Sequence, residues 1–200
     1  MEILYEDNHI IIVNKQAGEI IQGDKTGDRT VADEIKAYLK AKYNKPGAVF
    51  LGIPHRLDRP VSGVSIFART SKALARLNEM FRKGEIEKTY QAIVIHEPQI
   101  ESGTLEHWLT RNEKQNKAYA YNEQRENAKK AILDYEIEAK CDRYWLLNVH
   151  LHTGRHHQIR CQLAAIGCPI KGDLKYGAPR SNADGSICLH ARSIRFEHPV

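Results

Sequence analysis

A charged segment at residues 55–63, with the sequence HRLDRPVSG, has the clearest potential for chemistry. Its Asp58 lies between Arg56 and Arg59, and nearby cations favour the ionised form of a carboxyl group at neutral pH. Pro60 restricts the backbone, and Gly63 allows conformations that other residues avoid. The segment therefore predicts a turn of defined shape that presents the carboxylate just before the apolar run at residues 64–68. A surface turn with a charge-balanced aspartate has the same local pattern, so this segment alone leaves both interpretations open.

Two further segments carry polar side chains on regular elements. In the strand predicted over residues 86–95, Lys88 and Tyr90 point to the same side, because side chains two positions apart share a face. Residues 154–160, GRHHQIR, lead into a helix in which Arg160 lies beside an apolar stripe, so we expect this side chain to be partly buried and to need an anion. The plainer alternatives are an ordinary strand aromatic at Tyr90 and a surface arginine with a buried stem at Arg160.

The elements that must position these segments follow from periodicity and from end signals. Alternating or apolar runs predict strands at residues 2–5, 9–14, 64–68, 86–95, 131–139, 145–151 and 188–196, and helical spacing predicts helices at 30–43, 71–84 and 159–166. Thr30 and Ser71 are the expected N-caps, and Gly84 and Gly167 mark helix ends. We expect the strands at 131–139 and 145–151 to form an antiparallel pair with one face on the core, and the polar segment 111–130 to be an exposed hairpin or loop.

The bulk properties narrow the class of protein. A chain of 200 residues predicts one domain, and the excess of 30 Lys+Arg over 25 Asp+Glu suits a polyanionic partner without proving one. No apolar run approaches the roughly 20 residues of a membrane span, and acidic residues interrupt the first apolar residues, so neither a span nor a secretory signal is predicted. The four cysteines are widely spaced without a Cys-x-x-Cys pair, which argues against a disulfide framework or zinc knuckle and fits a reducing cytosol.

Three of these segments, in this order, resemble the motifs of the RluA-type family of RNA pseudouridine synthases. Residues 55–63 look like that family's catalytic-aspartate motif, Lys88-Thr89-Tyr90 is similar to its Lys-x-Tyr strand, and residues 154–160 look like its third motif. Residues 167–177 and 189–199 agree as well, so the resemblance extends from the first predicted hairpin to Pro199.

The resemblance implies an α+β fold, with a long, mostly antiparallel mixed sheet flanked by helices. It also implies a single catalytic domain over residues 1–200 without a separate N-terminal RNA-binding module. The implied activity is an isomerase that converts a uridine of structured RNA, ribosomal or transfer RNA, into pseudouridine. Asp58 would be the essential carboxylate, acting either as the nucleophile at the sugar carbon or as the base that removes a neighbouring sugar proton. Tyr90 would stack on the uracil, Arg160 would pair with Asp58, and neither a metal nor an organic cofactor is needed.

Further candidates for substrate binding surround these three residues. From the same motifs we expect RNA contacts from His55, Arg56, Arg59, Lys88, Arg155, His157 and Gln158. The expected protein is a cytoplasmic monomer that holds RNA on its own surface.

Other functions fit the sequence less well or stay open. A catalytically silent RNA-binding or RNA-folding factor on the same fold remains the alternative, whereas a carboxylate-based hydrolase lacks a second acidic motif. A metal site at His150, His152, His156 and His157 lacks cysteines or carboxylates at ligand spacing.

Overall fold

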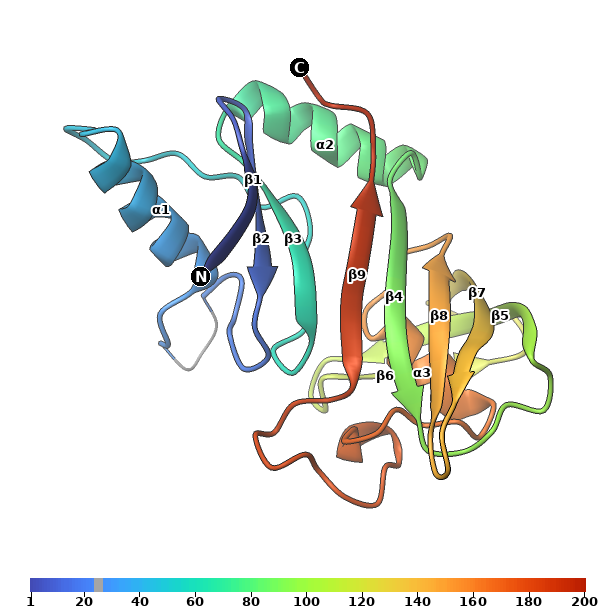
Figure 1. The fold of residues 1–200 in the computed structure, drawn as a ribbon. Coiled ribbons are helices and arrows are strands. Elements are labelled where there is room, and N and C mark those ends of the chain that lie inside the picture. Colours follow the sequence, from blue (N-terminus) through green and yellow to red (C-terminus); the bar gives the residue numbers. More distant parts are fainter. Residues whose placement is uncertain (24–26) are drawn as a thin grey trace. The chain divides into compact units, whose positions relative to one another are not determined.

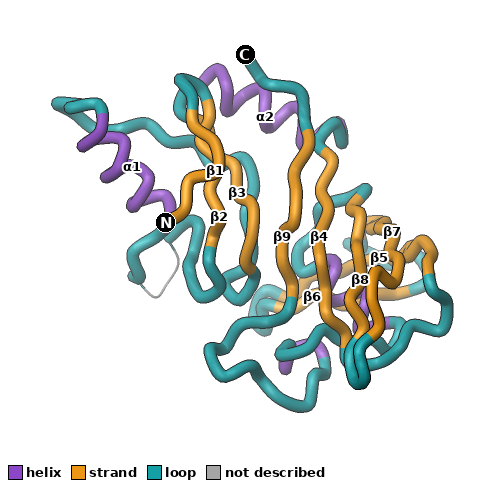
Figure 2. The backbone as a smooth tube through the Cα atoms, viewed as in Figure 1, coloured by secondary structure: helices purple, strands orange, loops and turns teal. Residues whose placement is uncertain are grey.

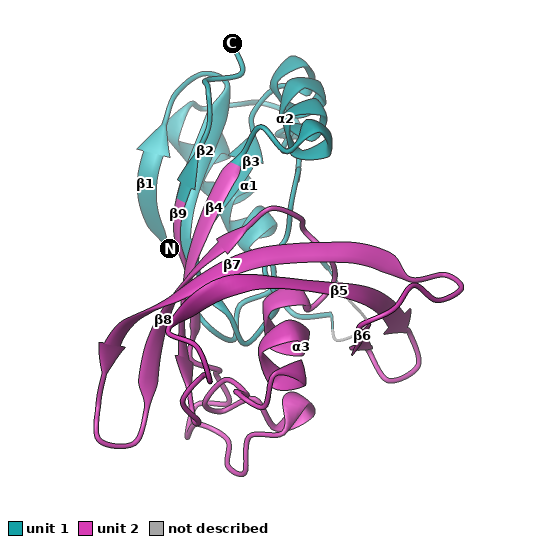
Figure 3. Ribbon diagram, turned by 90° about the vertical axis from the view of Figure 1, so that its right-hand side faces the viewer, with its two compact units in different colours: residues 1–86, 194–200 teal, residues 87–193 magenta. Residues whose placement is uncertain are grey.

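The computed structural model describes residues 1–23 and 27–200, and within them the chain forms nine β-strands and three α-helices (Figure 1). These elements belong to two compact units, which are residues 1–86 with 194–200 (unit 1) and residues 87–193 (unit 2), coloured separately in Figure 3. Figure 2 separates the helices from the strands and loops. None of the described helices combines the length and the apolar character that crossing a membrane requires. The strands and helices confirm the predicted α+β class.

Unit 1 is built on three antiparallel strands, which are β1 (Glu2–Glu6), β2 (Ile10–Lys15) and β3 (Ser62–Ala68). The register of β2 and β3 pairs Ile10 with Ala68 and Lys15 with Gly63, so the end of β2 lies next to the residues that follow Asp58. The unit also contains α1 (Val31–Lys42) and α2 (Ser71–Lys83). A core that includes Ile10, Ile66 and Leu77 joins α2 to the sheet.

The ends of these two helices test the predicted caps. The side chain of Thr30 accepts a hydrogen bond from the backbone N–H of Asp33, and the Asp33 side chain bonds back to the Thr30 backbone, which confirms this N-cap. The prediction of Ser71 as the next N-cap was wrong, because the hydroxyl of Thr70 accepts from the N–H of Ala73 and Ser71 is already helical. Two adjacent hydroxyl residues both satisfy the sequence rule, and only the extended backbone of Thr70 has the cap geometry.

Unit 2 contains a larger sheet with the strand order β9-β4-β8-β7-β5-β6. Its strands are β4 (Glu87–Val94), β5 (Ser102–Asn112), β6 (Lys117–Tyr121), β7 (Lys129–Lys140), β8 (Trp145–Leu151) and residues 189–193 of β9 (Leu189–Arg195). The pairs β4–β8, β7–β8, β5–β7 and β5–β6 are antiparallel. Helix α3 (Gln158–Ala165) and a short 3-10 helix, Leu174–Tyr176, complete the unit.

The predicted pair of strands at 131–139 and 145–151 is confirmed. Leu133 lies opposite Leu151 and Tyr135 opposite Val149, and these side chains are buried on one face as the alternation requires. A register shift between Ile137 and Ala139 interrupts the pairing near its far end. This face forms the core of unit 2.

The polar segment 111–130 is a hairpin rather than an open loop. Strand β5 runs to Asn112, a turn follows, and β6 pairs back so that Thr110 lies opposite Tyr119. The sequence predicts no element for residues 102–110, which form most of β5. The inner face of the hairpin, with Leu109 and Ala118, packs with Cys161 of α3.

Candidate active site

The residues expected to carry the chemistry are divided between the two units. Asp58 belongs to unit 1, whereas Tyr90 and Arg160 belong to unit 2. The geometry of each group is therefore given within its own unit.

The side chain of Lys15, the last residue of β2, donates hydrogen bonds to the backbone of the Asp58 loop, residues 55–63. Lys15 is fully buried, and its Nζ donates to the carbonyl oxygens of Val61 (2.6 Å), Gln16 (3.0 Å), Arg59 (3.2 Å) and Asp58 (3.3 Å). Burial lowers the pKa of Lys15 to about 8, a fall that the nearby carboxylates of Glu19 and Asp58 partly offset. Lys15 thus fixes the backbone that carries Asp58, a role that the sequence reasoning did not assign to it.

Further backbone contacts shape this loop. The N–H of Val61 donates to the carbonyl of Asp58 (3.1 Å) and closes a turn over residues 58–61, as the sequence predicts. The N–H of Gly18 donates to the carbonyl of Arg59 (2.8 Å), and Gly63 has φ of 120°, which few other residues adopt. Asp58 is half-buried on this loop.

The neighbouring substrate-binding candidates have different surroundings. His55 accepts the backbone N–H of Ile66 at Nε2 (3.0 Å), and its ring lies 5.0 Å from the ring of Phe81, so the imidazole ties the loop to β3 and α2. Arg59 forms an exposed ion pair with Asp28 (2.8 Å), and Arg56 is exposed to solvent. An exposed pair of this kind contributes little to stability and leaves the cation accessible to phosphate.

In unit 2 the side chain of Arg160 is buried and paired with a carboxylate. Its Nε donates to Oδ2 of Asp173 (2.6 Å) and its Nη2 donates to Oδ1 (2.9 Å), a bidentate contact. The two side chains are only 6% and 1% exposed. The sequence predicts that Arg160 is partly buried and needs an anion; the anion is confirmed, and the burial is more complete than predicted. Sequence reasoning gave no role to Asp173, whose only signal is its place in the segment Gly172-Asp173, and the pairing of Arg160 with Asp58 stays a prediction.

His157 and Tyr176 extend this buried group. The hydroxyl of Tyr176 accepts the backbone N–H of Ala118 (2.7 Å) and lies 2.9 Å from Nδ1 of His157, so the hydroxyl proton is assigned to that nitrogen. Burial and then the charge of Arg160 lower the pKa of His157 to about 2, which keeps the imidazole neutral and able to accept. His157 also stacks on His156 with ring centroids 3.8 Å apart.

Gln158 and Arg155 stabilise the turn that leads into α3. Oε1 of Gln158 accepts from the hydroxyl of Thr153 (2.8 Å) and from the N–H of Arg155 (2.9 Å), while its Nε2 donates to the carbonyl of Ile132 (3.1 Å). The exposed Arg155 donates from Nε to the carbonyl of Lys130 (2.9 Å). The amide of Gln158 therefore contributes to the shape of the turn.

Lys88 and Tyr90 lie on β4, as the sequence predicts, and both are half-buried. Tyr90 lies opposite Val149 of β8. Burial lowers the pKa of Lys88, and a Cβ atom added at Gly154 would lie 3.5 Å from the Lys88 amine. This distance places the Lys-x-Tyr strand beside the start of the 154–160 segment within unit 2.

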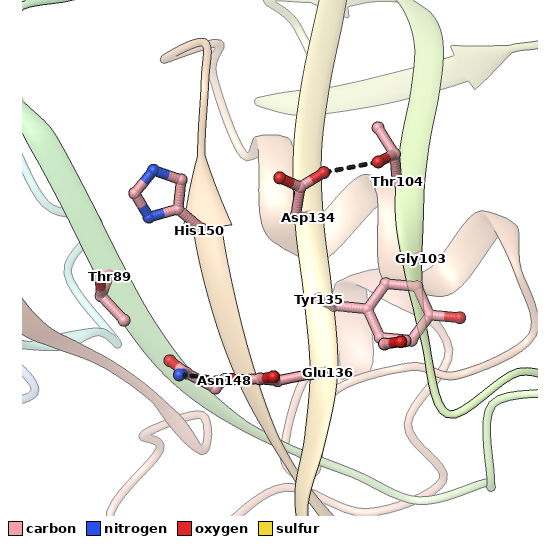
Figure 4. Close-up of a pocket in the computed structure, with 9 residues that line it drawn as sticks. Thr89, Gly103, Thr104, Asp134, Tyr135, Glu136, Asn148 and His150 are labelled. Atoms are coloured by element: carbon pink, nitrogen blue, oxygen red, sulfur yellow. Dashed lines mark hydrogen bonds between the residues drawn. The ribbon is translucent and has the colours of Figure 1, made fainter.

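A pocket of about 440 Å³ lies in unit 2 (Figure 4). It is lined by Thr89, Ser102, Gly103, Thr104, Asp134, Tyr135, Glu136, Asn148 and His150. None of the predicted site residues is among them, because Thr89 alternates with Lys88 and Tyr90 along β4. Near this pocket Asp134 accepts from the hydroxyl of Thr104 (2.6 Å), and its other oxygen lies 2.6 Å from Nε2 of His152.

Comparisons with known proteins agree with this arrangement of motifs. The family model described as RNA pseudouridylate synthase matches residues 9–165. The chain is 34% identical to an uncharacterized RNA pseudouridine synthase of Chlorobaculum parvum, over 99% of this chain and 67% of the relative. It is 30% identical to ribosomal large subunit pseudouridine synthase D of Xylella fastidiosa, over 100% of this chain and 62% of the relative. It is 32% identical to tRNA pseudouridine synthase C of Vibrio parahaemolyticus, over 100% of this chain and 85% of the relative. The chain thus spans less than two thirds of the length of some of the curated relatives it matches, such as the Xylella protein.

Solved structures share the fold. Human RNA pseudouridylate synthase domain containing 4 superposes with a TM-score of 0.80 at 24% identity, covering 98% of this chain and 84% of that one. Human RNA pseudouridylate synthase domain containing 1 superposes with a TM-score of 0.77 at 25% identity, covering 98% of this chain and 78% of that one. Because the family model matches residues 9–165, the chain belongs to the RNA pseudouridylate synthase family, which confirms the resemblance identified in its motifs.

Proposed function

We propose that this protein is an RNA pseudouridine synthase, an isomerase that converts a specific uridine of structured RNA into pseudouridine. The observation that carries the proposal is Asp58, a half-buried carboxylate on a turn whose carbonyl groups are bound by the buried Lys15. A loop fixed in this way holds its carboxylate in one position, as a group that attacks or deprotonates a sugar requires. Family membership supports the same reaction.

The reaction rearranges the nucleotide without net gain or loss of atoms. The bond between the sugar and N1 of uracil breaks, the base turns, and a new bond forms between the sugar and C5. C5 releases its hydrogen as a proton, and N1 takes up a proton in exchange, so the atoms balance. Asp58 acts either as the nucleophile at the sugar carbon or as the base that removes a neighbouring sugar proton. Both roles require the ionised carboxylate.

The other predicted residues complete the proposed site. Tyr90 stacks on the uracil and offers a hydroxyl for proton transfer at C5, and Arg160 pairs with Asp58. The proposed RNA contacts are made by His55, Arg56, Arg59, Lys88, Arg155, His157 and Gln158. Of these, the exposed Arg56 and Arg155, together with Arg59 in its exposed ion pair, are the first candidates for phosphate contacts.

Structured RNA is the proposed partner because the relatives quoted above are named for ribosomal and transfer RNA. The target nucleotide must leave its stack to reach a half-buried carboxylate, which favours a loop or bulge. We propose that the described residues serve as one catalytic domain and that the protein is a cytoplasmic monomer. The four cysteines, none of which forms a disulfide, suit a reducing compartment.

The test is a comparison of pseudouridine maps of total RNA from cells with and without the gene, and from cells that carry only Asp58→Asn. We expect one or a few sites to disappear in the deletion and to stay absent in the variant. Those sites would also name the RNA. The alternative, a catalytically silent RNA-binding factor, predicts the same map in all three strains.

A further inference from the structure

The turn at Asp173 is built to hold its carboxylate rigidly. The backbone N–H of Asp173 donates to the carbonyl of Ile170 (3.0 Å), and its own carbonyl accepts from Tyr176 (3.1 Å) and Ala178 (3.0 Å). The preceding Gly172 has φ of 89°, and a Cβ atom there would lie 2.8 Å from the carbonyl oxygen of Ser186. The backbone on both sides of Asp173 is therefore fixed by contacts that do not involve the side-chain pair with Arg160.

The guanidinium of Arg160 is restrained on one edge and on one face. Nε and Nη2 bind the two oxygens of Asp173, so the contact sets the plane of the group as well as its position. The ring of Tyr176 lies 5.1 Å from Cζ of Arg160, and the Tyr176 hydroxyl is itself bound to Ala118 and His157. The bidentate contact with Asp173 comes from Nε and Nη2, and because the guanidinium is planar this contact also sets the direction of Nη1.

Stability alone does not explain such a pair. Removing two charges from water is costly, and well-packed apolar residues of similar size often stabilise a fold equally well or better. A bidentate pair does supply what apolar packing cannot, which is a guanidinium with one fixed orientation.

We propose that Asp173 is a positioning residue for the isomerisation, acting through Arg160. By fixing the guanidinium, Asp173 sets the direction in which Nη1 points during the reaction. Its negative charge also offsets part of the positive charge of Arg160 and so weakens the electric field of Arg160 at the reacting groups. This inference rests on the proposed function, in which Arg160 takes part in the reaction. Asp173 itself touches Arg160 rather than the substrate.

The first experiment compares Asp173→Asn with the wild type in single-turnover and steady-state assays of C5 hydrogen release from RNA. Asparagine keeps the shape but replaces one acceptor oxygen with an NH₂ group that faces the guanidinium. Because a misplacement of about 1 Å can cost on the order of 100-fold, we expect kcat to fall at least about 10-fold with little change in KM. The assay is run well below the melting temperature of each variant, where every molecule is folded.

The matched control is Asp134→Asn, also in unit 2. Asp134 likewise binds two side chains, those of Thr104 and His152, but it lines the pocket that holds none of the predicted site residues. We expect its kcat to stay within about twofold of the wild type, since surface changes of this kind have small effects. A folded Asp173→Asn protein with the kcat of this control would overturn the proposal.

A second measurement uses the wild-type protein and keeps the proposal falsifiable even if Asp173→Asn fails to fold. In ¹⁵N NMR the Nε–H of Arg160, assigned by its loss in Arg160→Lys, should exchange slowly with water and report a rigid guanidinium. Fast exchange and free rotation in the wild type would contradict a positioning role. Failure of the proposed function is recognised separately, because the wild type would then release no hydrogen from any RNA while the Nε–H stayed protected.

Discussion

Unit 1 and unit 2 each bury one cation next to a predicted catalytic segment, and they do so in opposite ways. Lys15 is held by four neutral carbonyl groups, those of Asp58, Arg59 and Val61 and that of its neighbour Gln16, and burial brings its pKa down to about 8. Arg160 is held by the carboxylate of Asp173 in a bidentate pair. Lys15 fixes the backbone around Asp58, and these four hydrogen bonds of its ammonium group go to carbonyl groups rather than to a carboxylate. Asp173 fixes the side chain of Arg160 and also compensates its positive charge. The comparison indicates that the backbone of the Asp58 loop is positioned by hydrogen bonds from a buried cation, whereas the guanidinium of Arg160 is positioned by a carboxylate.

The largest expected effect is that of Arg160→Met. Removing one partner of a buried pair leaves the carboxylate of Asp173 without its cation, so we expect a loss of about 3 kcal/mol in the free energy of unfolding. The rate of pseudouridine formation should fall many-fold as well. Urea denaturation and the C5 hydrogen-release assay measure the two effects.

The double variant Arg160→Met, Asp173→Leu separates stability from catalysis. Because the stranded carboxylate is removed too, stability should return in part while activity stays low. Recovery of activity together with stability would mean that the pair has only a structural role.

A smaller effect is expected for Lys15→Met, which keeps the length of the side chain. Carbonyl groups of Asp58, Arg59 and Val61 would lose their donor, which should cost roughly 2 kcal/mol of stability and reduce kcat through a looser loop. Lys36→Met, a change in the exposed part of α1, serves as the control. Unchanged stability in Lys15→Met would remove Lys15 from the account of the Asp58 loop.

The pH dependence sharpens the contrast between the two cations. Lys15 has a folded pKa of about 8, below its ordinary value of 10.5, so between these values the unfolded chain binds more protons than the folded one. The free energy of unfolding of the wild type should therefore rise from pH 8 to pH 10.5 relative to that of Lys15→Met. A difference that stays flat across this window would contradict the lowered pKa.

The smallest effect concerns cations that lie on the surface of unit 2. If RNA phosphate contacts Lys129, Lys129→Gln should reduce the slope of log affinity against log salt by about 0.7 to 0.9. Lys130→Gln should reduce it less, because Lys130 already pairs with Glu106 (2.9 Å). Lys140→Gln, at the other end of β7 and bound to Glu97 and Glu101, is the control. Equal slopes in all three variants would remove the 111–130 segment from the RNA-binding face.

Features encoded by neighbouring residues could be predicted from the sequence. The Thr30 cap, the end of α2 at Gly84 and the alternation of β7 and β8 each depend on contacts within a few residues or on a period along one strand. The burial of Arg160 followed from the apolar stripe beside it. Strand β5 was missed because His107 lies on its buried face and Trp108 on its outer face, which obscures the alternation of apolar and polar residues.

The supports of the candidate site could not be predicted in the same way. Lys15 donates to carbonyl groups 43 to 46 positions away. Every residue has a backbone carbonyl, so the sequence does not indicate which of them accept a hydrogen bond. Asp173 meets Arg160 only because a tight turn at Gly172 follows α3. Each contact depends on how the elements pack rather than on a local pattern.

In the proposed reaction Asp58 carries the essential step, whereas Lys15 and Asp173 position the groups that act. The most direct measurement is the release of hydrogen from C5-labelled uridine in substrate RNA by Asp58→Asn, with melting temperature and RNA affinity measured on the same preparation. We predict that release is abolished while the melting temperature and the affinity stay close to those of the wild type. Turnover by the folded variant would contradict the account.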